Sequence, residues 1–96
     1  MHGYSYVWDE KKNKSNIKKH GVSFIEAETV FDDVNALVYD DEEHSNLEER
    51  FIIIGMSSRL RLLMVCHCFR ENDTQIRIIS ARKATKNEQK LYRGMS

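Results

Sequence analysis

The sequence predicts an α+β fold in which an antiparallel sheet carries two N-terminal helices on one face. Two observations predict it. Residues 50–81 contain three apolar stretches separated by short polar turns, a pattern typical of an antiparallel meander. Residues 9–31 contain two helical segments with clear start and stop signals. The predicted order is strand, helix, helix, four strands and a final helix, within a single domain that spans residues 1–96.

The first third of the chain predicts a strand followed by two helices. Residues 4–8 are aromatic and β-branched, as strands prefer. Asp9 is a good N-cap for a helix, and Gly21 is a good stop for it. Ser23 and Glu26 have the spacing of a capping box, so a second helix is expected there. The apolar stripe of that helix consists of Phe24, Ala27, Val30 and Phe31.

The rest of the chain predicts the sheet. Residues 36–39 have the pattern of a short strand, and the polar residues 40–49 indicate a loop. Further strands are expected over residues 50–56, 61–69 and 74–81, and a last helix over about 84–93. If both early helices cover one face of this sheet, the other face is available for a ligand.

Charge is distributed unevenly although the formal net charge is zero. Residues 32–49 contain eight acidic residues and no Lys or Arg, whereas residues 50–96 contain ten Lys and Arg against three acids. This asymmetry suggests two surfaces, a basic one for phosphate and an acidic one for a basic partner. The alternative is a solvated acidic loop beside a basic surface that only aids solubility. No apolar run approaches the roughly 18 residues of a membrane span, and the first residues lack a signal-peptide pattern, so a cytoplasmic protein is expected.

The only two cysteines, Cys66 and Cys68, flank His67 in an apolar stretch. Neighbouring strand residues point to opposite faces, so these three side chains cannot bind one metal ion together. We therefore expect two buried, reduced thiols and no metal site. The sequence also has no glycine-rich phosphate loop, and no cofactor is expected.

Several basic side chains are candidates for chemistry on the sheet. Regular alternation predicts that Arg61 and Arg77 line one face together with His67. Arg77 lies between two isoleucines and is a candidate phosphate ligand, or alternatively it forms an ion pair with Glu48 or Glu49. His67 is either a packed or surface histidine or a proton-transfer group.

A second histidine candidate, His44, lies in the acidic loop. Glu42, Glu43, Glu48 and Glu49 are close to it in the sequence. Together a histidine and a carboxylate form a common acid–base pair. The alternative is a solvated loop histidine without a catalytic role.

Motifs along nearly the whole chain resemble the BrnT family of bacterial toxins, which belongs to the RelE-like ribonuclease superfamily. The strongest are the Lys-His-Gly-Val-Ser-Phe run at 19–24 and the Arg-Ile-Ile-Ser-Ala-Arg-Lys-Ala run at 77–84. Supporting residues are Trp8, Asp9, Lys12, Asn16, Glu26, Ala27, Val30, Phe31, Asp32, Asp33, Glu49, Arg50, Ile54, Gly55, Glu88 and Tyr92. Val34 departs from the family, which often has proline there, but this position is in a turn.

The resemblance implies a RelE-like fold and a ribonuclease toxin of a type II toxin–antitoxin module. Such a toxin cleaves RNA and arrests growth. Its expected partner is a BrnA-like antitoxin with a ribbon-helix-helix DNA-binding domain, and the complex is expected to bind and repress its own promoter. Promoter DNA would be contacted only through the antitoxin. The alternative function is a non-catalytic co-repressor that acts only within a DNA-bound complex.

For RNA cleavage without a metal ion, we assign provisional roles to eight residues. Arg61 and Arg77 are expected to hold the phosphate, because the guanidinium fork matches phosphate oxygens and remains charged. Glu49, His44 and His67 are the candidates for the base and the acid. Additional RNA and phosphate contacts are expected from Arg50, Arg82 and Lys83.

Overall fold

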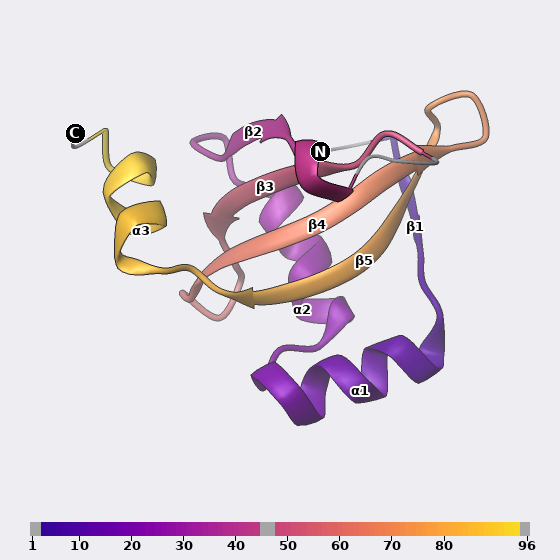
Figure 1. Ribbon diagram of the computed structural model, residues 1–96, viewed down its shortest axis with the longest axis horizontal. Helices are drawn as coiled ribbons and strands as arrows, with labels where there is room; N and C mark the ends of the chain where they lie inside the picture. The colour runs from indigo at the N-terminus through magenta and orange to yellow at the C-terminus, as the bar shows by residue number, and fades with distance from the viewer. Residues whose placement is uncertain (1–2, 45–47, 95–96) are drawn as a thin grey trace.

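The structure is a computed structural model that describes residues 3–44 and 48–94. Five strands form one sheet in the order β1-β5-β4-β3-β2 (Figure 1). The strands are β1 (Ser5–Val7), β2 (Leu37–Asp40), β3 (Phe51–Met56), β4 (Leu62–Arg70) and β5 (Gln75–Lys83). The helices are α1 (Glu10–His20), α2 (Phe24–Thr29) and α3 (Lys86–Tyr92), with short 3₁₀ turns η1 (Val30–Asp32) and η2 (Glu42–His44).

The predicted α+β class and the antiparallel meander β3-β4-β5 are confirmed. One pairing differs from the prediction. The first strand adds to the sheet beside β5 and runs parallel to it, so the sheet is mixed rather than wholly antiparallel. The chain between β1 and β5 contains both early helices and the other three strands, and parallel pairing requires a long connection of this kind.

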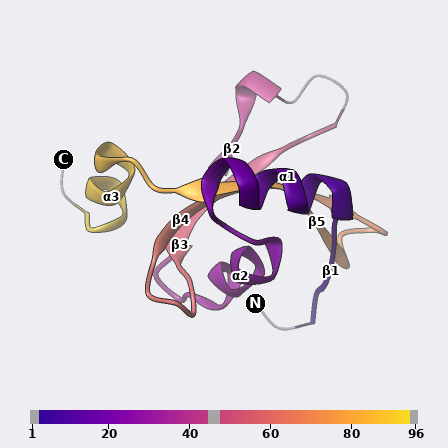
Figure 2. The same ribbon diagram turned by 90° about the horizontal axis from the view of Figure 1, so that it is seen from below.

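Both early helices lie on the same face of the sheet, as predicted (Figures 1 and 2). The predicted stripe of α2 and η1 is buried against β3, β4 and β5. Helix α1 starts at the N-cap Asp9, whose side chain accepts from the amides of Lys11 and Lys12, and stops at Gly21 with φ 69°. We call this side of the sheet the covered face. The core that it buries consists of Val22, Phe24, Ala27, Val30, Phe31, Ile53, Leu63, Val65, Ile76, Ile78 and Ala81.

A polar side chain joins α1 to the sheet. The Asn16 amide donates to the carbonyls of Val22 and Ala81, both at 2.8 Å, and accepts from the Ala81 amide at 3.1 Å. Asn13 accepts from the amide of Phe24 at 2.9 Å. These buried amides explain why a helix with few apolar residues packs on the sheet at all, since they satisfy backbone groups that would otherwise be buried without partners.

A β-bulge interrupts the pairing of β4 with β5. Cys66 is opposite Ser80, but the next residue, His67, is opposite Ile78, so Ile79 is an extra residue on β5. Consequently Ile78 and Ala81 both face the core although three positions separate them. The regular alternation assumed in the sequence analysis therefore fails at the bulge, and Arg77 and Ala81 lie on opposite faces although four positions separate them.

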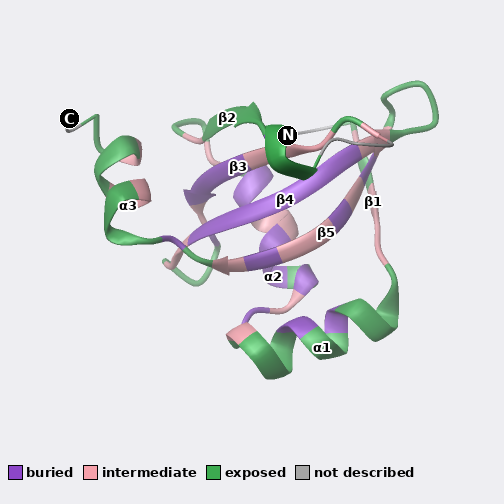
Figure 3. Ribbon diagram, viewed as in Figure 1, coloured by how far each residue is buried: buried purple, intermediate pink, exposed green. Residues whose placement is uncertain are grey.

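The final helix α3 stands away from the other two helices, beyond the end of β5 (Figure 2). None of its residues is buried, as Figure 3 shows by colour. Its start is fixed by a complete capping box between Thr85 and Glu88. Among the described helices, none is long and apolar enough to cross a membrane.

Candidate active site

The uncovered face of the sheet, which we call the open face, contains a hollow of about 310 Å³. It is formed by β3, β4 and β5 below and by η2 at one side. The residues that line it are Asp41, Glu43, His44, Arg50, Ile52, Met64, Cys66, Ile79, Ser80 and Arg82. Three residues predicted from the sequence, His44, Arg50 and Arg82, are thus brought together although 38 positions separate the first from the last.

The hollow contains a histidine–carboxylate pair. His44 Nδ1 lies 3.1 Å from both carboxylate oxygens of Asp41, whose side chain is buried, whereas the His44 ring is 59% exposed. The turn η2 creates this geometry, because the His44 amide also bonds to the Asp41 carbonyl at 3.3 Å. With Nδ1 held by Asp41, a neutral ring keeps its proton there and has an unprotonated Nε2. A ring in this state can accept a proton from a substrate.

Asp41 also contacts the floor of the hollow. The Cys66 thiol donates to Asp41 Oδ2 at 3.5 Å. Burial, and after it the hydrogen bond to Asp41, raise the pKa of Cys66 to about 12. The thiol is therefore not a nucleophile at neutral pH, as expected from the sequence. Its role here is to support the carboxylate that orients His44.

Arg82 lies at the far side of the hollow and is tied to α3. Its two terminal nitrogens donate to the carboxylate oxygens of Glu88 at 2.8 and 3.0 Å, and Nη1 also donates to the Lys83 carbonyl at 3.2 Å. These three bonds use three of the five donors of the guanidinium group. About a third of the side chain is exposed, at 34%, so a phosphate oxygen can approach the guanidinium group from solvent.

Arg61 is not on the open face, contrary to the prediction. Its guanidinium forms an ion pair with Glu26 and donates to the Gly21 carbonyl at 3.0 Å, on the covered face. Glu26 is buried and also accepts from the Ser57 hydroxyl at 2.7 Å. The hydrogen bond from Arg61 lowers the pKa of Glu26, against the opposing effect of burial. The Arg61 guanidinium is therefore held in a structural network on the covered face. The predicted capping box of α2 forms only in part: the Ser23 hydroxyl accepts from the Glu26 amide, but the Glu26 carboxylate binds Arg61 and Ser57 instead of the Ser23 amide.

His67 lies in the core, so the structure also overturns its predicted role as an acid or base. It is 1% exposed and packs edge-on against Phe31, with ring centroids 4.8 Å apart. Burial lowers its pKa to about 4. No RNA group can reach a ring in this position. Of the alternatives for His67, the structure shows the packed histidine.

The other predicted site residues lie around the hollow or away from it. Arg77 is opposite Cys68 on the open face, one row of side chains beyond the Cys66–Ser80 pair. Lys83 is opposite Leu63, which faces the core, so its side chain leaves the sheet on the other side from Arg82. Glu49 is exposed and lines a shallow depression with Arg50, outside the main hollow. The phosphate and catalytic roles assigned to these residues remain predictions.

Sequence reasoning missed Asp41 and Glu88. Asp41 precedes His44 by three residues, a spacing that brings two side chains together on a helical turn, and this was the available signal. Glu88 is six residues after Arg82 and is the N3 residue of the capping box that Thr85 begins. Within residues 3–44 and 48–94, no group of three or more His, Cys, Asp and Glu side chains has the arrangement of a metal site.

Both the sequence and the fold of the chain are similar to those of known proteins. A family model described as "Ribonuclease toxin, BrnT, of type II toxin-antitoxin system" matches residues 8–88. The crystal structure of the Brucella abortus ribonuclease toxin, BrnT, superposes with a TM-score of 0.67 at 26% sequence identity, covering 86% of this chain and 99% of that chain. Among curated proteins, none matches this sequence.

Proposed function

Because the chain belongs to the BrnT family of ribonuclease toxins of type II toxin–antitoxin systems, we propose that it cleaves RNA at the hollow of the open face without a metal ion. In this proposal residues 1–96 form one RelE-like toxin domain whose activity arrests growth. Family membership supports ribonuclease activity and a cognate antitoxin. The site and the mechanism rest on the pairing of His44 with Asp41 beside Arg50 and Arg82.

RNA supplies its own nucleophile for this reaction. The 2′-hydroxyl loses its proton and its oxygen attacks the adjacent phosphorus, which forms a pentacoordinate phosphorane with additional negative charge. The bond from phosphorus to the 5′-oxygen then breaks, and that oxygen takes up a proton. The products are a 2′,3′-cyclic phosphate and a 5′-hydroxyl. An enzyme therefore needs a base near the 2′-oxygen and cations near the phosphate oxygens.

We assign the base to His44. Asp41 holds Nδ1, so Nε2 is the atom that accepts the 2′-proton. The carboxylate also stabilises the imidazolium that forms, as the orienting carboxylate does in other histidine-based sites. The ring is exposed at the rim of the hollow, so an RNA strand lying on the open face can place a ribose against it.

We assign phosphate binding to Arg50 and Arg82, with Arg77 holding the next phosphate along the strand. Arg50 and Arg82 line the same hollow as His44. Arginine suits a phosphorane because it remains charged and presents several donors in one plane. Arg77 lies one row further along the same face, in a direction that an extended strand would follow.

The proposed partner is a BrnA-like ribbon-helix-helix antitoxin. In the complex, the antitoxin covers the open face of the toxin and blocks the hollow. The same complex binds promoter DNA and represses transcription. The toxin itself contacts the promoter only through the antitoxin. Steric coverage is sufficient for neutralisation, because the proposed site lies on an exposed surface rather than in a closed cleft.

The test is cleavage of RNA by the purified chain after separation from its antitoxin, in EDTA. We expect cleavage to persist in EDTA and to give 2′,3′-cyclic phosphate ends. A substrate with a single 2′-deoxyribose at the cleaved position should be resistant, because it lacks the nucleophile. Cleavage of that deoxy substrate, or its loss in EDTA, would contradict the mechanism. A complete lack of cleavage together with retained promoter binding of the complex would favour the co-repressor alternative.

A further inference from the structure

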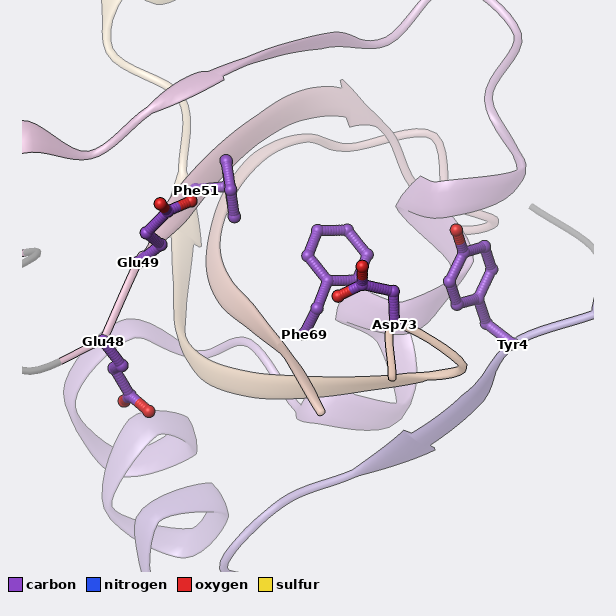
Figure 4. Close-up of a pocket in the computed structure, with 6 residues that line it drawn as sticks. All are labelled: Tyr4, Glu48, Glu49, Phe51, Phe69 and Asp73. Atoms are coloured by element: carbon purple, nitrogen blue, oxygen red, sulfur yellow. The ribbon is translucent and has the colours of Figure 1, made fainter. Parts of the chain in front are cut away.

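A second hollow, of about 400 Å³, lies where β3 begins and β4 ends. We call it the aromatic–acid pocket. Its lining residues come from four segments: the approach to β1, the first residue of β3 with the residues before it, the end of β4 and the turn before β5. They are Tyr4, Glu48, Glu49, Phe51, Phe69 and Asp73 (Figure 4). His44, Arg50 and Arg82 do not line this pocket, whereas Glu49, a candidate acid or base from the sequence, does.

Three aromatic rings form the apolar part of the pocket. Phe69 is central, with its ring centroid 5.5 Å from that of Phe51 and 6.0 Å from that of Tyr4. All three side chains are half-buried, so each presents part of its ring to the hollow. The faces of aromatic rings carry negative potential and attract cations.

Carboxylates complete the lining. In the view of Figure 4 the Asp73 carboxylate overlaps the Phe69 ring on the side toward Tyr4, and Glu49 lies beside Phe51. Glu48 already pairs with Arg50 and Arg70, at 3.5 and 3.2 Å. Within the part of the chain that the structure describes, Glu49 and Asp73 have no ion-pair partner, and no Lys, Arg or His lines the pocket. The pocket therefore favours a cation and disfavours an RNA phosphate.

We propose that this pocket binds an arginine side chain of the antitoxin. A guanidinium group is flat, stacks on aromatic faces and binds carboxylates with two parallel hydrogen bonds, so it uses both halves of the lining. Charge complementarity and the mixed aromatic lining argue for arginine over an apolar anchor. This inference rests on the proposed function only in that the partner is the protein antitoxin.

The position of the pocket explains how such an anchor affects the active site. Glu49 lines the aromatic–acid pocket, and the next residue, Arg50, lines the hollow that contains His44. The rings of the pocket pack on the covered-face side, so an antitoxin segment with an arginine in the pocket is held at the end of the sheet where Glu49 and Arg50 lie. To exclude RNA, the adjoining part of that segment passes around this end of the sheet and lies across the hollow.

The first experiment uses small probes with the full-length toxin. Nα-acetyl-arginine methylamide is titrated against the protein by NMR, with the uncharged isostere Nα-acetyl-citrulline methylamide as the comparison. We expect the arginine probe to shift the resonances of Tyr4, Phe51 and Phe69 and to bind roughly 3- to 30-fold more tightly than citrulline. Equal binding of the two probes, or tighter binding of adenosine 5′-monophosphate at these rings, would overturn the proposal.

The second experiment measures the affinity of the cognate antitoxin for three toxin variants. Phe69→Leu and Asp73→Asn should each weaken binding by roughly 3- to 30-fold. Glu71→Gln removes a carboxylate from the same turn outside the pocket and should leave affinity unchanged. RNA cleavage by the free variants separates this inference from the proposed function. Unchanged antitoxin affinity in folded, RNA-cleaving Phe69→Leu and Asp73→Asn variants would refute the arginine pocket while leaving the ribonuclease site intact.

Discussion

The two faces of the sheet use polar side chains in different ways. On the covered face, two buried polar side chains each have more than one partner: Glu26 is bound by Ser57 and Arg61, and Asn16 by Val22 and Ala81. On the open face, His44 and Arg82 are each held by one carboxylate and are partly exposed. On the covered face, these polar side chains use their hydrogen-bonding groups within the protein and stabilise the fold. Those on the open face are oriented but still have donors and acceptors for a ligand.

The strongest test of this contrast is His44→Ala. We expect the rate of RNA cleavage to fall by roughly 10²- to 10⁴-fold, the usual contribution of a general base. The free energy of unfolding should change by less than about 0.5 kcal/mol, because the ring is mostly exposed. Single-turnover cleavage and urea denaturation measure the two quantities. His20→Ala on α1 is the control, and an equal loss of activity in that variant would show that the effect is not specific to the hollow.

Arg61→Ala should show the opposite behaviour. Removing the guanidinium leaves the buried Glu26 carboxylate without its main partner, which we expect to cost about 3 kcal/mol of unfolding free energy. Activity per folded molecule should persist. Arg59→Ala is a matched control, since Arg59 approaches the same carboxylate at 3.8 Å but is 70% exposed. A folded Arg61→Ala protein that has lost cleavage would restore the catalytic role that the sequence suggested.

The pH dependence of stability sharpens the contrast. The pKa of His67 is about 4 in the folded chain against an ordinary value of 6.5, so the unfolded chain binds more protons between these values. The contribution of the neutral ring to stability is therefore complete above pH 6.5 and is lost as the pH falls towards 4, by about 3 kcal/mol. In His67→Phe this part of the pH dependence should disappear. The free energy of unfolding is measured by urea denaturation at each pH. If it falls equally with pH in the unsubstituted protein and in His67→Phe, the His67 ring is not buried.

The smallest expected effect is that of Arg77→Ala. Loss of one phosphate contact at the edge of the site should weaken RNA binding by about 1.5 kcal/mol, or roughly tenfold in Kd, with little change in stability. The dependence of log K on log salt should decrease by about 0.7, as expected for one contact to a single strand. Arg93→Ala, an exposed change in the last turn of the chain, is the control. Binding that is unaffected in Arg77→Ala would confine the RNA site to the hollow around His44.

Most of the helices and strands could be predicted from local sequence signals. Asp9, Gly21 and Ser23 fixed the limits of the helices, and the apolar stretches indicated the meander, because capping and alternation depend on neighbouring residues alone. The parallel pairing of β1 with β5 is different. It depends on contacts between residues about 70 positions apart, such as Ser5 with Gln75, for which a single sequence has no local signal.

The site was harder to predict for a related reason. His44, Arg50 and Arg82 were identified as types of residue, but their neighbours depend on η2 and on the bulge at Ile79. Arg61 was misplaced because an arginine beside an apolar strand has the same sequence pattern whether it binds a ligand or a buried glutamate. Only the packing of α2 against the turn at Ser57 decides between the two.

The single additional residue on β5 determines which face of the sheet each later residue of the strand points to. In an unbroken strand, positions 77 and 82 are an odd number apart and would point in opposite directions. With Ile79 inserted, both arginines project from the same side, while the core still receives Ile76, Ile78 and Ala81. The bulge thus lets one strand place both arginines on the open face and three apolar residues in the core. Without the bulge, a strand of this same sequence would send either Arg77 or Arg82 towards the hydrophobic interior, whereas deleting Ile79 would leave the two arginines four positions apart and on the same side.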